Sequence, residues 1–418
     1  MVQLPTFELP KYIVARGHKA KHVLAGSATP YLSIEDLIAL SSEPDKTEEA
    51  FGVIRSLKLS DDMQQGSLAV RSAIARLYNS ESSSSNDDSK RSDSGSGSGS
   101  TSISISPEHI MTAIGTTGAN LTVFQTLLDV GDHVICMYPT YGQLLGVPRG
   151  FIPCEVSRWE MDPQRGWKLD LDELRRLIRP GSTKMLVLNN PSNPTGTHMD
   201  ADMQREILDI AREHDLTVLV DEIFRPLFHQ GGGGGGGDGA KVPPSFVEHE
   251  YTKLVVTGSM SKAYGLTGVR VAFSAIDEVI ATEALSERCR PAILRRHLGY
   301  ARKNLELLEA FMDKNGDMLS WTKPTAGATA FIKISSSKNG EAVDDVEFCR
   351  AVLEEQGLLL TPGSLCFGKV QVPGEERERK MVDLQGYVRC HFTLPPEKMV
   401  QALEAWDAFL QKRRAAPS

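Results

Sequence analysis

Short apolar runs alternate with amphipathic segments along the first two thirds of the chain. The apolar runs predict buried strands at residues 133–137, 184–189, 216–221 and 253–258. Apolar residues at helical spacing predict helices at residues 36–41, 68–78, 119–128, 171–178 and 201–213. Strands that alternate with helices in this way are typical of an α/β domain with a mainly parallel sheet.

The pattern changes after residue 275. Longer amphipathic stretches predict helices at residues 294–314, 346–355 and 397–410, and two apolar runs predict strands at 328–334 and 387–392. Such a mixture is typical of a separate, smaller α+β domain. We therefore expect a large domain at residues 59–275 and a small domain at residues 276–418, to which the N-terminal segment 1–58 also belongs.

Two polar stretches interrupt the large domain. Residues 80–106 are rich in Ser, Gly and Asp, and residues 231–239 include seven consecutive glycines. Neither has the apolar side chains that offset the entropy of ordering a chain, so we expect both to be flexible surface loops. Because no G-x-G-x-x-G motif joins a strand to a helix, the sequence disfavours a NAD-dependent oxidoreductase.

Composition and charge exclude several classes of protein. The 418 residues carry 46 Lys and Arg against 54 Asp and Glu, a net charge of −8, whereas a nucleic-acid-binding chain normally has a basic face. No apolar run approaches the ~20 residues that span a membrane, and the N-terminus lacks the apolar core of a signal peptide. The six scattered cysteines predict buried thiols in a reducing compartment, so we expect a cytoplasmic chain. From the charge and the lack of a long apolar run, we expect no nucleic-acid and no membrane partner. The ten histidines form no H-E-x-x-H motif, and we expect no metal site.

Polar and charged residues follow the predicted strands. Asn190 opens the sequence NPSNPTG after one strand, Asp221 ends the next, and Ser259 opens SMSKAYGLTGVR after the last. Ligands of α/β proteins bind at the carboxyl ends of the strands. An amide, a carboxylate, a lysine, an arginine, a hydroxyl and an aromatic ring at one such edge suit one cofactor, pyridoxal 5′-phosphate.

The same motifs resemble those of a known family. NPSNPTG, DEIF, SMSKAYGLTGVR and the late YVRCHF are similar, in the same order, to the signature of the class I/II aminotransferases, the pyridoxal-phosphate enzymes of fold type I. Within that family, YPTYGQL, DEIFRPLFH, GSMSKAY and PGSLCFG resemble the capreomycidine-synthase-like branch. The resemblance covers residues 24–410 apart from the two polar stretches. It implies the aspartate-aminotransferase-like fold, an α/β large domain with a mostly parallel sheet and a smaller α+β domain.

The resemblance also implies roles for three residues of these motifs. Lys262 would form the Schiff base with the cofactor aldehyde and, once released, would move a proton between the substrate Cα and the cofactor C4′. Asp221 would keep the pyridine nitrogen protonated, which lets the ring take up electrons. Asn193 would hydrogen-bond O3′ of the ring and contact the substrate.

Other residues match positions that bind the phosphate, the ring face and the substrate carboxylate. Free N–H groups at a helix N-terminus, with a hydroxyl and a guanidinium nearby, favour a phosphate. We assign this role to Gly118, Ala119, Asn120, Ser259, Ser261 and Arg270. Tyr141 matches the aromatic residue that stacks on the ring, and Arg389 matches the arginine that binds the substrate α-carboxylate with two hydrogen bonds.

The sequence departs from the family pattern at three places. Phe224, which we count among the cofactor-binding residues, stands where most members have a Tyr that donates a hydrogen bond to O3′. No tyrosine precedes Gly66, where the family has one that reaches the phosphate of the neighbouring subunit. The segment between Arg270 and the long helix is shorter than in the family, so we expect a helix or more to be missing there.

The resemblance implies transamination between an amino acid and a 2-oxo acid, catalysed by a homodimer. A carbon–sulfur lyase or an amino-acid cyclase on the same scaffold stays open, because all three reactions begin with loss of the substrate Cα proton. A chain that binds the cofactor but turns over poorly also stays open, because of Phe224 and the short segment after Arg270.

Overall fold

The computed structural model describes residues 7–57, 65–84, 104–229, 242–269, 275–335, 343–367 and 384–415. The polar stretch 80–106 lies mostly outside these residues, and the stretch 231–239 lies wholly outside them.

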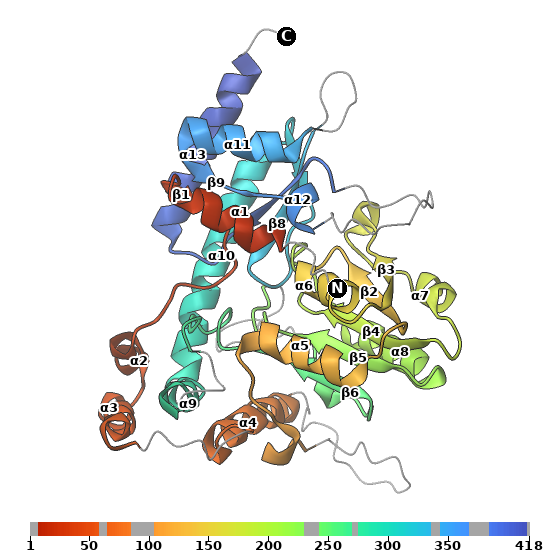
Figure 1. Cartoon of the computed structure of the whole chain (residues 1–418). Helices are drawn as coiled ribbons and strands as arrows, with labels where there is room; N and C mark the ends of the chain where they lie inside the picture. The colour runs from red at the N-terminus through yellow and green to blue at the C-terminus, as the bar shows by residue number, and fades with distance from the viewer. Residues whose placement is uncertain are drawn as a thin grey trace, which may run out of the picture.

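A parallel sheet forms the centre of the larger part of the molecule (Figure 1). Within the described residues its order is β3 (Glu155–Glu160), β2 (His133–Tyr138), β4 (Thr183–Asn189), β5 (Thr217–Asp221) and β6 (Leu254–Thr257), with all neighbours parallel. The four predicted apolar strands are confirmed as β2, β4, β5 and β6. The sequence did not predict β3, because it is an edge strand and its sequence EVSRWE is mostly polar.

Helices connect these strands and flank the sheet (Figure 1). They are α5 (Gly115–Leu127), α6 (Gly142–Gly150), α7 (Leu171–Leu177) and α8 (Ala201–Glu213). The predicted helices at 171–178 and 201–213 are confirmed. Each begins after an aspartate, Asp170 or Asp200, whose carboxylate accepts a hydrogen bond from a backbone N–H of the first turn.

A second sheet lies in the upper part of the molecule in Figure 1 and is antiparallel. Among the described residues its order is β10 (Thr361–Pro362), β11 (Tyr387–His391), β8 (Thr329–Ile334) and β7 (Leu319–Trp321). The accompanying helices are α10 (Arg290–Lys314), α11 (Asp345–Gln356), α12 (Gly363–Phe367) and α13 (Pro396–Ala415). The strands and helices predicted after residue 275 are thus confirmed, with α10 four residues longer at its start.

The N-terminal residues join this upper part. Helix α1 (Glu8–Gly17) lies beside the C-terminal elements in Figure 1, and β1 (His22–Val23) pairs in parallel with β9 (Leu358–Leu359). The chain then continues through α2 (Ile34–Leu40) and α3 (Pro44–Gly52) to α4 (Leu68–Ser84), which lies near α9 (Ala275–Ala284). Short 3₁₀ turns occur at Val53–Ser56, Pro107–His109, Pro163–Arg165 and Phe246–Glu248.

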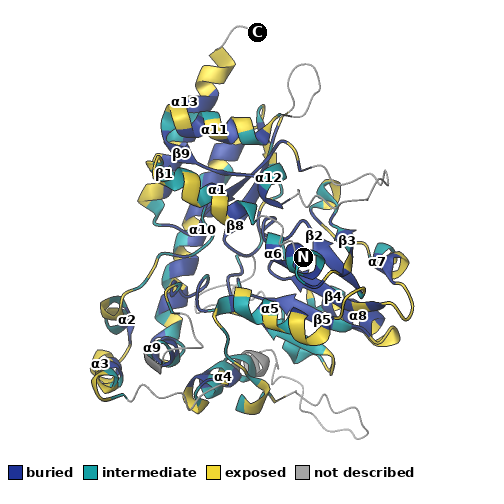
Figure 2. Ribbon diagram, in the orientation of Figure 1, coloured by how far each residue is buried: buried dark blue, intermediate teal, exposed yellow. Residues whose placement is uncertain are grey.

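Burial follows this architecture (Figure 2). The inner strands β2, β4 and β5 of the parallel sheet are almost entirely buried, and a continuous apolar core runs from them into the antiparallel sheet and α13. A second apolar cluster joins α2, α4 and α9 to the N-terminal half of α10. All six cysteines are buried and unpaired, as the sequence predicts. In the described part of the chain, no helix has the length and apolar character needed to cross a membrane.

Candidate functional site

The carboxyl ends of the parallel strands bring three predicted site segments together. In the register of the sheet, Asn189 at the end of β4 lies opposite Asp221 at the end of β5, and Asp221 lies opposite Thr257 at the end of β6. The segments that carry Asn193 and Lys262 follow directly. Parallel strands therefore place these groups at one edge, as expected from the sequence.

Asp221 is buried at this edge. Its side chain is 2% exposed. Oδ1 accepts a hydrogen bond from the backbone N–H of Ile223 at 3.0 Å, and Oδ2 accepts one from Nδ2 of Asn120 at 3.1 Å. Burial raises the pKa of Asp221 to about 6, while both hydrogen bonds and the charge of Lys262 oppose that rise. A buried carboxylate near a lysine can hold a protonated ring nitrogen.

Lys262 lies in a loop held from two sides. Its backbone carbonyl accepts two hydrogen bonds from Thr29, and the next carbonyl, that of Ala263, accepts one from Nδ1 of His297 at 3.0 Å. The charge of Lys262 influences the pKa of both Asp221 and His391, so its ammonium group lies within electrostatic reach of both. Because these partners come from the N-terminal segment and from α10, no local sequence signal indicates them.

The helix predicted at 119–128 begins earlier than expected, and this changes which residues carry its free N–H groups. Helix α5 starts at Gly115, where φ is +60°, so Gly118 lies in the first turn while Ala119 and Asn120 lie beyond it. Gly115 and Gly118 suggested a turn before the helix because Gly is a poor helix former, so the helix was predicted to start after them. Gly is tolerated in the first turn of a helix, and both residues lie in it. The free N–H groups of the helix belong to its first residues, Gly115, Thr116 and Thr117.

This first turn lies beside the loop that precedes Lys262. Oγ1 of Thr116 donates to the carbonyl of Gly258 at 3.3 Å. In the same loop, Oγ of Ser259 donates to Oγ of Ser261 at 2.9 Å and accepts from the N–H of Ser261 at 3.0 Å. A helix N-terminus and two serine hydroxyls thus converge in a way that suits a phosphate. Arg270, predicted for the same group, lies outside the described residues.

Arg389 is a buried cation in β11. Its side chain is 1% exposed, and among the described residues it has no carboxylate partner. Nη1 donates to Oδ1 of Asn193 at 3.1 Å, Nη2 donates to the carbonyls of Ala25 and Gly26, and Nε has no partner among the described residues. Burial lowers the pKa of this guanidinium to about 10. A buried guanidinium without a carboxylate partner suits an anionic ligand.

Tyr141 and Phe224 follow strands β2 and β5, and His391 ends strand β11 two residues after Arg389. Tyr141 directly precedes α6 and meets the ring of Phe7 edge-on, with the centroids 5.3 Å apart. Phe224 follows β5 and is 1% exposed, so a hydroxyl at this position would need a buried partner. The sequence analysis missed His391, which is buried two residues after Arg389 and donates to or accepts from Oγ1 of Thr393 at 2.7 Å.

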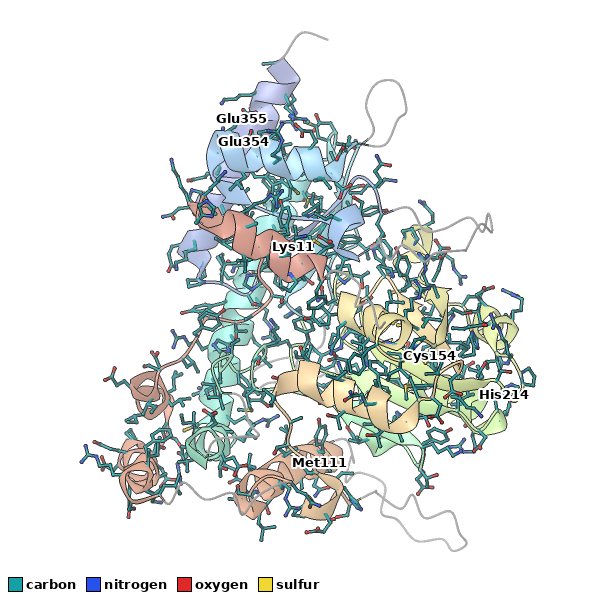
Figure 3. The ribbon with its side chains drawn as sticks, viewed as in Figure 1. Lys11, Met111, Cys154, His214, Glu354 and Glu355 are labelled. Carbon is teal, nitrogen blue, oxygen red and sulfur yellow. The ribbon has the colours of Figure 1, made fainter. Side chains whose placement is uncertain are left out.

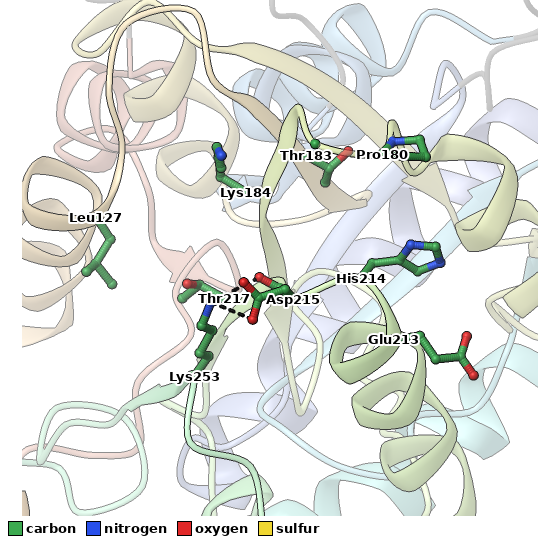
Figure 4. A pocket seen from close by; sticks show the side chains of 10 residues that line it. Leu127, Pro180, Thr183, Lys184, Glu213, His214, Asp215, Thr217 and Lys253 are labelled. Carbon is green, nitrogen blue, oxygen red and sulfur yellow. Dashed lines mark hydrogen bonds and ion pairs between the residues drawn. The ribbon is translucent and has the colours of Figure 1, made fainter.

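A surface cavity of about 500 Å³ lies at the opposite, amino ends of the strands (Figure 4). Its lining includes Thr183 at the start of β4, Thr217 at the start of β5 and Lys253 before β6. Lys253 forms an ion pair of 2.6 Å with Asp215, so the charges there largely balance. This cavity is separate from the site at the carboxyl ends. Among the described residues, no group of His, Cys, Asp and Glu is arranged to bind a metal ion.

The residues present fit pyridoxal phosphate. A buried carboxylate at Asp221 suits its ring nitrogen, Lys262 suits its aldehyde, and the first turn of α5 with Ser259 suits its phosphate. The buried guanidinium of Arg389, with its unpartnered Nε, suits the carboxylate of an amino acid.

Comparison with known proteins agrees with this geometry. The family model described as aminotransferase class I and II matches residues 51–305. Capreomycidine synthase from Streptomyces vinaceus is 25% identical over 313 residues, which cover 68% of this chain and 76% of that protein. A PLP-dependent aminotransferase from Streptococcus suis has a solved structure with a TM-score of 0.80, 29% sequence identity and complete coverage of both chains. The PLP-dependent cyclase OrfR has a TM-score of 0.75 and 20% identity, with 98% of each chain covered.

The fold and the family model carry the assignment together. The model covers more than half of the chain, including the segments of Asp221 and Lys262, and the parallel sheet has the aspartate-aminotransferase-like arrangement of the solved relatives. Pyridoxal phosphate is therefore the cofactor, and amino acids and 2-oxo acids are the substrates. The chain belongs to the class I and II aminotransferase family and is a pyridoxal-phosphate-dependent aminotransferase.

Proposed function

We propose that Lys262 is the catalytic residue of this aminotransferase. Pyridoxal phosphate, when bound, supplies an aldehyde that combines with amines and a ring that takes up electrons from the substrate. The Nζ atom of Lys262 holds the aldehyde carbon before substrate arrives and afterwards moves the proton of the substrate Cα. The support is the position of this lysine after β6, within electrostatic reach of Asp221.

Asp221 holds the ring nitrogen and keeps its proton in place. The carboxylate is buried and already accepts hydrogen bonds from Ile223 and Asn120, so its position is fixed. An added positive charge favours the ionised carboxylate, against the burial that raises its pKa to about 6. Asp221 is therefore ionised when it faces a protonated ring nitrogen.

The phosphate is bound between the first turn of α5 and the loop before Lys262. Backbone N–H groups from Gly115 to Thr117 and the hydroxyls of Ser259 and Ser261 are the donors in the described part of the chain. Thr116 and Thr117 join the predicted set, because the helix starts earlier than expected. Arg270 remains a predicted phosphate partner from sequence.

Arg389 and Asn193 bind the substrate carboxylate. Their side chains are hydrogen-bonded to each other at 3.1 Å and both are buried. Asn193 is fixed in turn by its N–H, which donates to Oδ1 of Asn189 at 2.7 Å. Tyr141 and Phe224 follow β2 and β5 at the carboxyl edge of the sheet, and we assign both to the cofactor ring.

Hydride trapping tests the assignment of Lys262. The protein reconstituted with pyridoxal phosphate is reduced with borohydride and digested, and the tagged peptide is identified by mass spectrometry. We expect the tag at Lys262 and no tag in a Lys262→Ala variant. A tag on another lysine, or none on the wild-type chain, would show that the assignment is wrong.

Product analysis separates transamination from the alternatives on the same scaffold. Transamination converts the amino acid to a 2-oxo acid and leaves the cofactor in its amine form, which absorbs at shorter wavelength. A carbon–sulfur lyase releases ammonia or a thiol, and a cyclase releases a cyclic amino acid. We expect the 2-oxo acid, because this chain belongs to the aminotransferase family. A cofactor-binding chain with impaired catalysis would show the cofactor spectrum without any of these products.

A homodimer is the assembly that we propose. The apolar side chains of Leu68, Met111 and Ile114 are 62%, 68% and 45% exposed, and exposed apolar groups that cluster commonly mark protein interfaces. Their segments are adjacent, because the N–H of Thr112 donates to the carbonyl of Gln65 at 3.1 Å, and Figure 3 shows Met111 beside α4. Sedimentation should give twice the chain mass, with a weaker dimer for Met111→Glu. A wild-type monomer at micromolar concentration would contradict this proposal.

We also propose the division into segment 1–58, large domain 59–275 and small domain 276–418, and a cytoplasmic location. The pairing of β1 with β9 supports the domain division, because it ties the N-terminal segment to the C-terminal part.

The six buried, unpaired thiols support the proposed cytoplasmic location, because they suit a reducing compartment. A cysteine-labelling assay on intact and lysed cells checks the location.

A further inference from the structure

A closed set of hydrogen bonds surrounds Asn120, and none of it is explained by a phosphate contact. The Asn120 side chain is 0% exposed. Its Nδ2 donates to Oδ2 of Asp221 at 3.1 Å, and its Oδ1 accepts from Oγ1 of Thr257 at 2.8 Å. Gln143 lies on the other side, with Oε1 3.5 Å from the same Nδ2 and Nε2 donating to the carbonyl of Thr117 at 2.7 Å.

The chemistry of the partners fixes the orientation of the Asn120 amide. An ionised carboxylate only accepts hydrogen bonds, so the amide nitrogen must face Asp221. The hydroxyl of Thr257 then donates to the amide oxygen, and this bond opposes a flip of the amide. In the flipped amide, an oxygen would face the carboxylate of Asp221 in a buried place, which is costly. Thr257 therefore fixes the amide that donates to the carboxylate of Asp221.

We propose that Asn120 is a positioning residue for Asp221, and that Thr257 and Gln143 hold it in that role. The inference rests on the proposed function, because it concerns the group that Asp221 binds. It replaces the phosphate contact expected for Asn120 from sequence. The same hydrogen bonds connect the part of the site assigned to the phosphate with the part assigned to the ring nitrogen. Gln143 is bonded to Thr117 in the first turn of α5, and Asn120 is bonded to Asp221.

The ionised form of Asp221 is stabilised by few groups, so each hydrogen-bond donor to its carboxylate matters. Among the described residues, Lys262 is the charged group that acts on Asp221, and the other favourable contacts are the neutral donors of Asn120 and Ile223. Loss of the Asn120 donor leaves one oxygen of a buried carboxylate without its partner. The ring nitrogen of the cofactor is then held less firmly at this atom.

Two ligands that differ only in the phosphate distinguish a role at Asp221 from a role at the phosphate. Dissociation constants of cofactor-free protein are measured for pyridoxal phosphate and for pyridoxal. If Asn120 positions Asp221, then Asn120→Leu weakens both ligands by a similar factor of about ten, because both carry the same ring nitrogen. If Asn120 serves the phosphate, the loss is confined to pyridoxal phosphate, and the proposal is overturned.

A matched pair at Thr257 gives a second test. Thr257→Val keeps the shape but removes the hydroxyl, and we expect both ligands to be weakened several-fold; Thr257→Ser keeps the hydroxyl and should stay within about twofold of wild type. The ¹⁵N chemical shift of labelled cofactor should move toward the unprotonated ring nitrogen in Asn120→Leu and Thr257→Val, but not in Thr257→Ser. Equal ligand dissociation constants and equal ¹⁵N shifts for the two Thr257 variants would overturn the proposal. This test does not depend on whether Asn120→Leu folds.

The same measurements separate this inference from the proposed function. Wild-type protein that binds neither ligand contradicts the proposed function itself. Wild-type protein that binds both ligands, together with Asn120 and Thr257 variants that bind them equally well, contradicts only the role of Asn120.

Discussion

Thr29 donates two hydrogen bonds to the backbone carbonyl of Lys262, from its N–H at 3.2 Å and from its hydroxyl at 2.8 Å. Thr29 is 1% exposed. A few residues earlier, the carbonyls of Ala25 and Gly26 accept hydrogen bonds from Arg389. One short stretch of the N-terminal segment therefore touches both the guanidinium that we assign to the substrate carboxylate and the backbone of Lys262, the lysine that we propose as catalytic.

Removal of the Thr29 hydroxyl should loosen the position of Lys262. Thr29→Val keeps the volume and the backbone N–H but loses the 2.8 Å bond. We expect kcat/KM to fall about tenfold and the free energy of unfolding to fall by about 1 kcal/mol, because a buried carbonyl loses one of two partners. Thr29→Ser keeps the hydroxyl and should behave like wild type in steady-state kinetics and denaturant unfolding. Equal kinetics for Val and Ser would refute the positioning role.

Shortening the cation at position 389 should affect substrate binding and not cofactor binding. Arg389→Lys keeps a positive charge but loses the planar fork that can bind a carboxylate with two bonds. We expect KM for amino acids to rise about 10- to 100-fold, since charge-assisted hydrogen bonds are worth about 1.5–3 kcal/mol. The dissociation constant of pyridoxal phosphate should stay unchanged. A parallel loss of cofactor affinity would show that Arg389 acts through the fold.

The sequence predicted the central strands well because burial on both faces leaves a clear pattern. The apolar runs at 184–189 and 216–221 match β4 and β5 almost residue for residue, and their polar ends locate Asp221. Edge strand β3 has mixed polar residues and gave no such signal. The start of α5 was placed too late, because Gly118 resembles a turn residue while the true first turn contains two threonines.

The partners that orient the site could not be predicted in this way. Thr29 and His297 are distant in sequence from Lys262, and neither stands in a motif. Asn120 was predicted from sequence as a phosphate-binding residue, and only the fold shows that its side chain reaches Asp221. Motifs identify residues that carry out the chemistry, whereas tertiary packing selects those that hold them in place.

The burial of Asp221 should make the cofactor-free protein less stable as the pH rises. The pKa of Asp221 is raised from 3.8 to about 6, first by burial. At Asp221 the folded chain then binds more protons than the unfolded chain between these values, so the contribution of this residue to stability is full below about pH 4 and is lost as the pH rises through 6. The shift of the Asp221 pKa from 3.8 to about 6 corresponds to about 3 kcal/mol of unfolding free energy, which is present below pH 4 and lost above pH 6.

Replacement of Asp221 by a neutral residue tests this sign. Cofactor-free Asp221→Asn should unfold at higher denaturant concentration than wild type at pH 7.5, and the gap should close at pH 4.5. Both proteins are measured by urea unfolding after removal of the cofactor. A variant that is less stable than wild type at pH 7.5 would contradict the raised pKa. The same variant should lose cofactor affinity, because the partner of the ring nitrogen is gone.

His297 holds the backbone directly after Lys262, through the carbonyl of Ala263. It is 0% exposed, and because a carbonyl only accepts, Nδ1 must carry the proton that it donates to Ala263 at 3.0 Å. Burial lowers the pKa of His297 from 6.5 to about 4, although the bond to Ala263 acts in the other direction. The imidazole is therefore neutral near pH 7, and Nε2 has no partner among the described residues.

Two substitutions separate the hydrogen bond of His297 from its packing. His297→Asn places an amide N–H where Nδ1 was, whereas His297→Leu fills the space without a donor. We expect the Leu variant to lose about 1–3 kcal/mol of stability, because the buried Ala263 carbonyl is left without its partner, and to lose kcat more than KM. The Asn variant should recover most of kcat. Equal kcat values for the two variants would show that the bond to Ala263 does not position Lys262.

The pH dependence of stability gives an independent check on His297. The unfolded chain protonates this residue near pH 6.5 but the folded chain only near pH 4, so the contribution of His297 to stability is full above 6.5 and is lost as the pH falls toward 4. Both variants lack this titrating group and should show a shallower decline, smaller by about 3 kcal/mol across that range. Urea unfolding at pH 7.5 and pH 4.5 measures the difference. An unchanged decline in both variants would mean that His297 has the same pKa in the folded and the unfolded chain, which would contradict the lowered pKa.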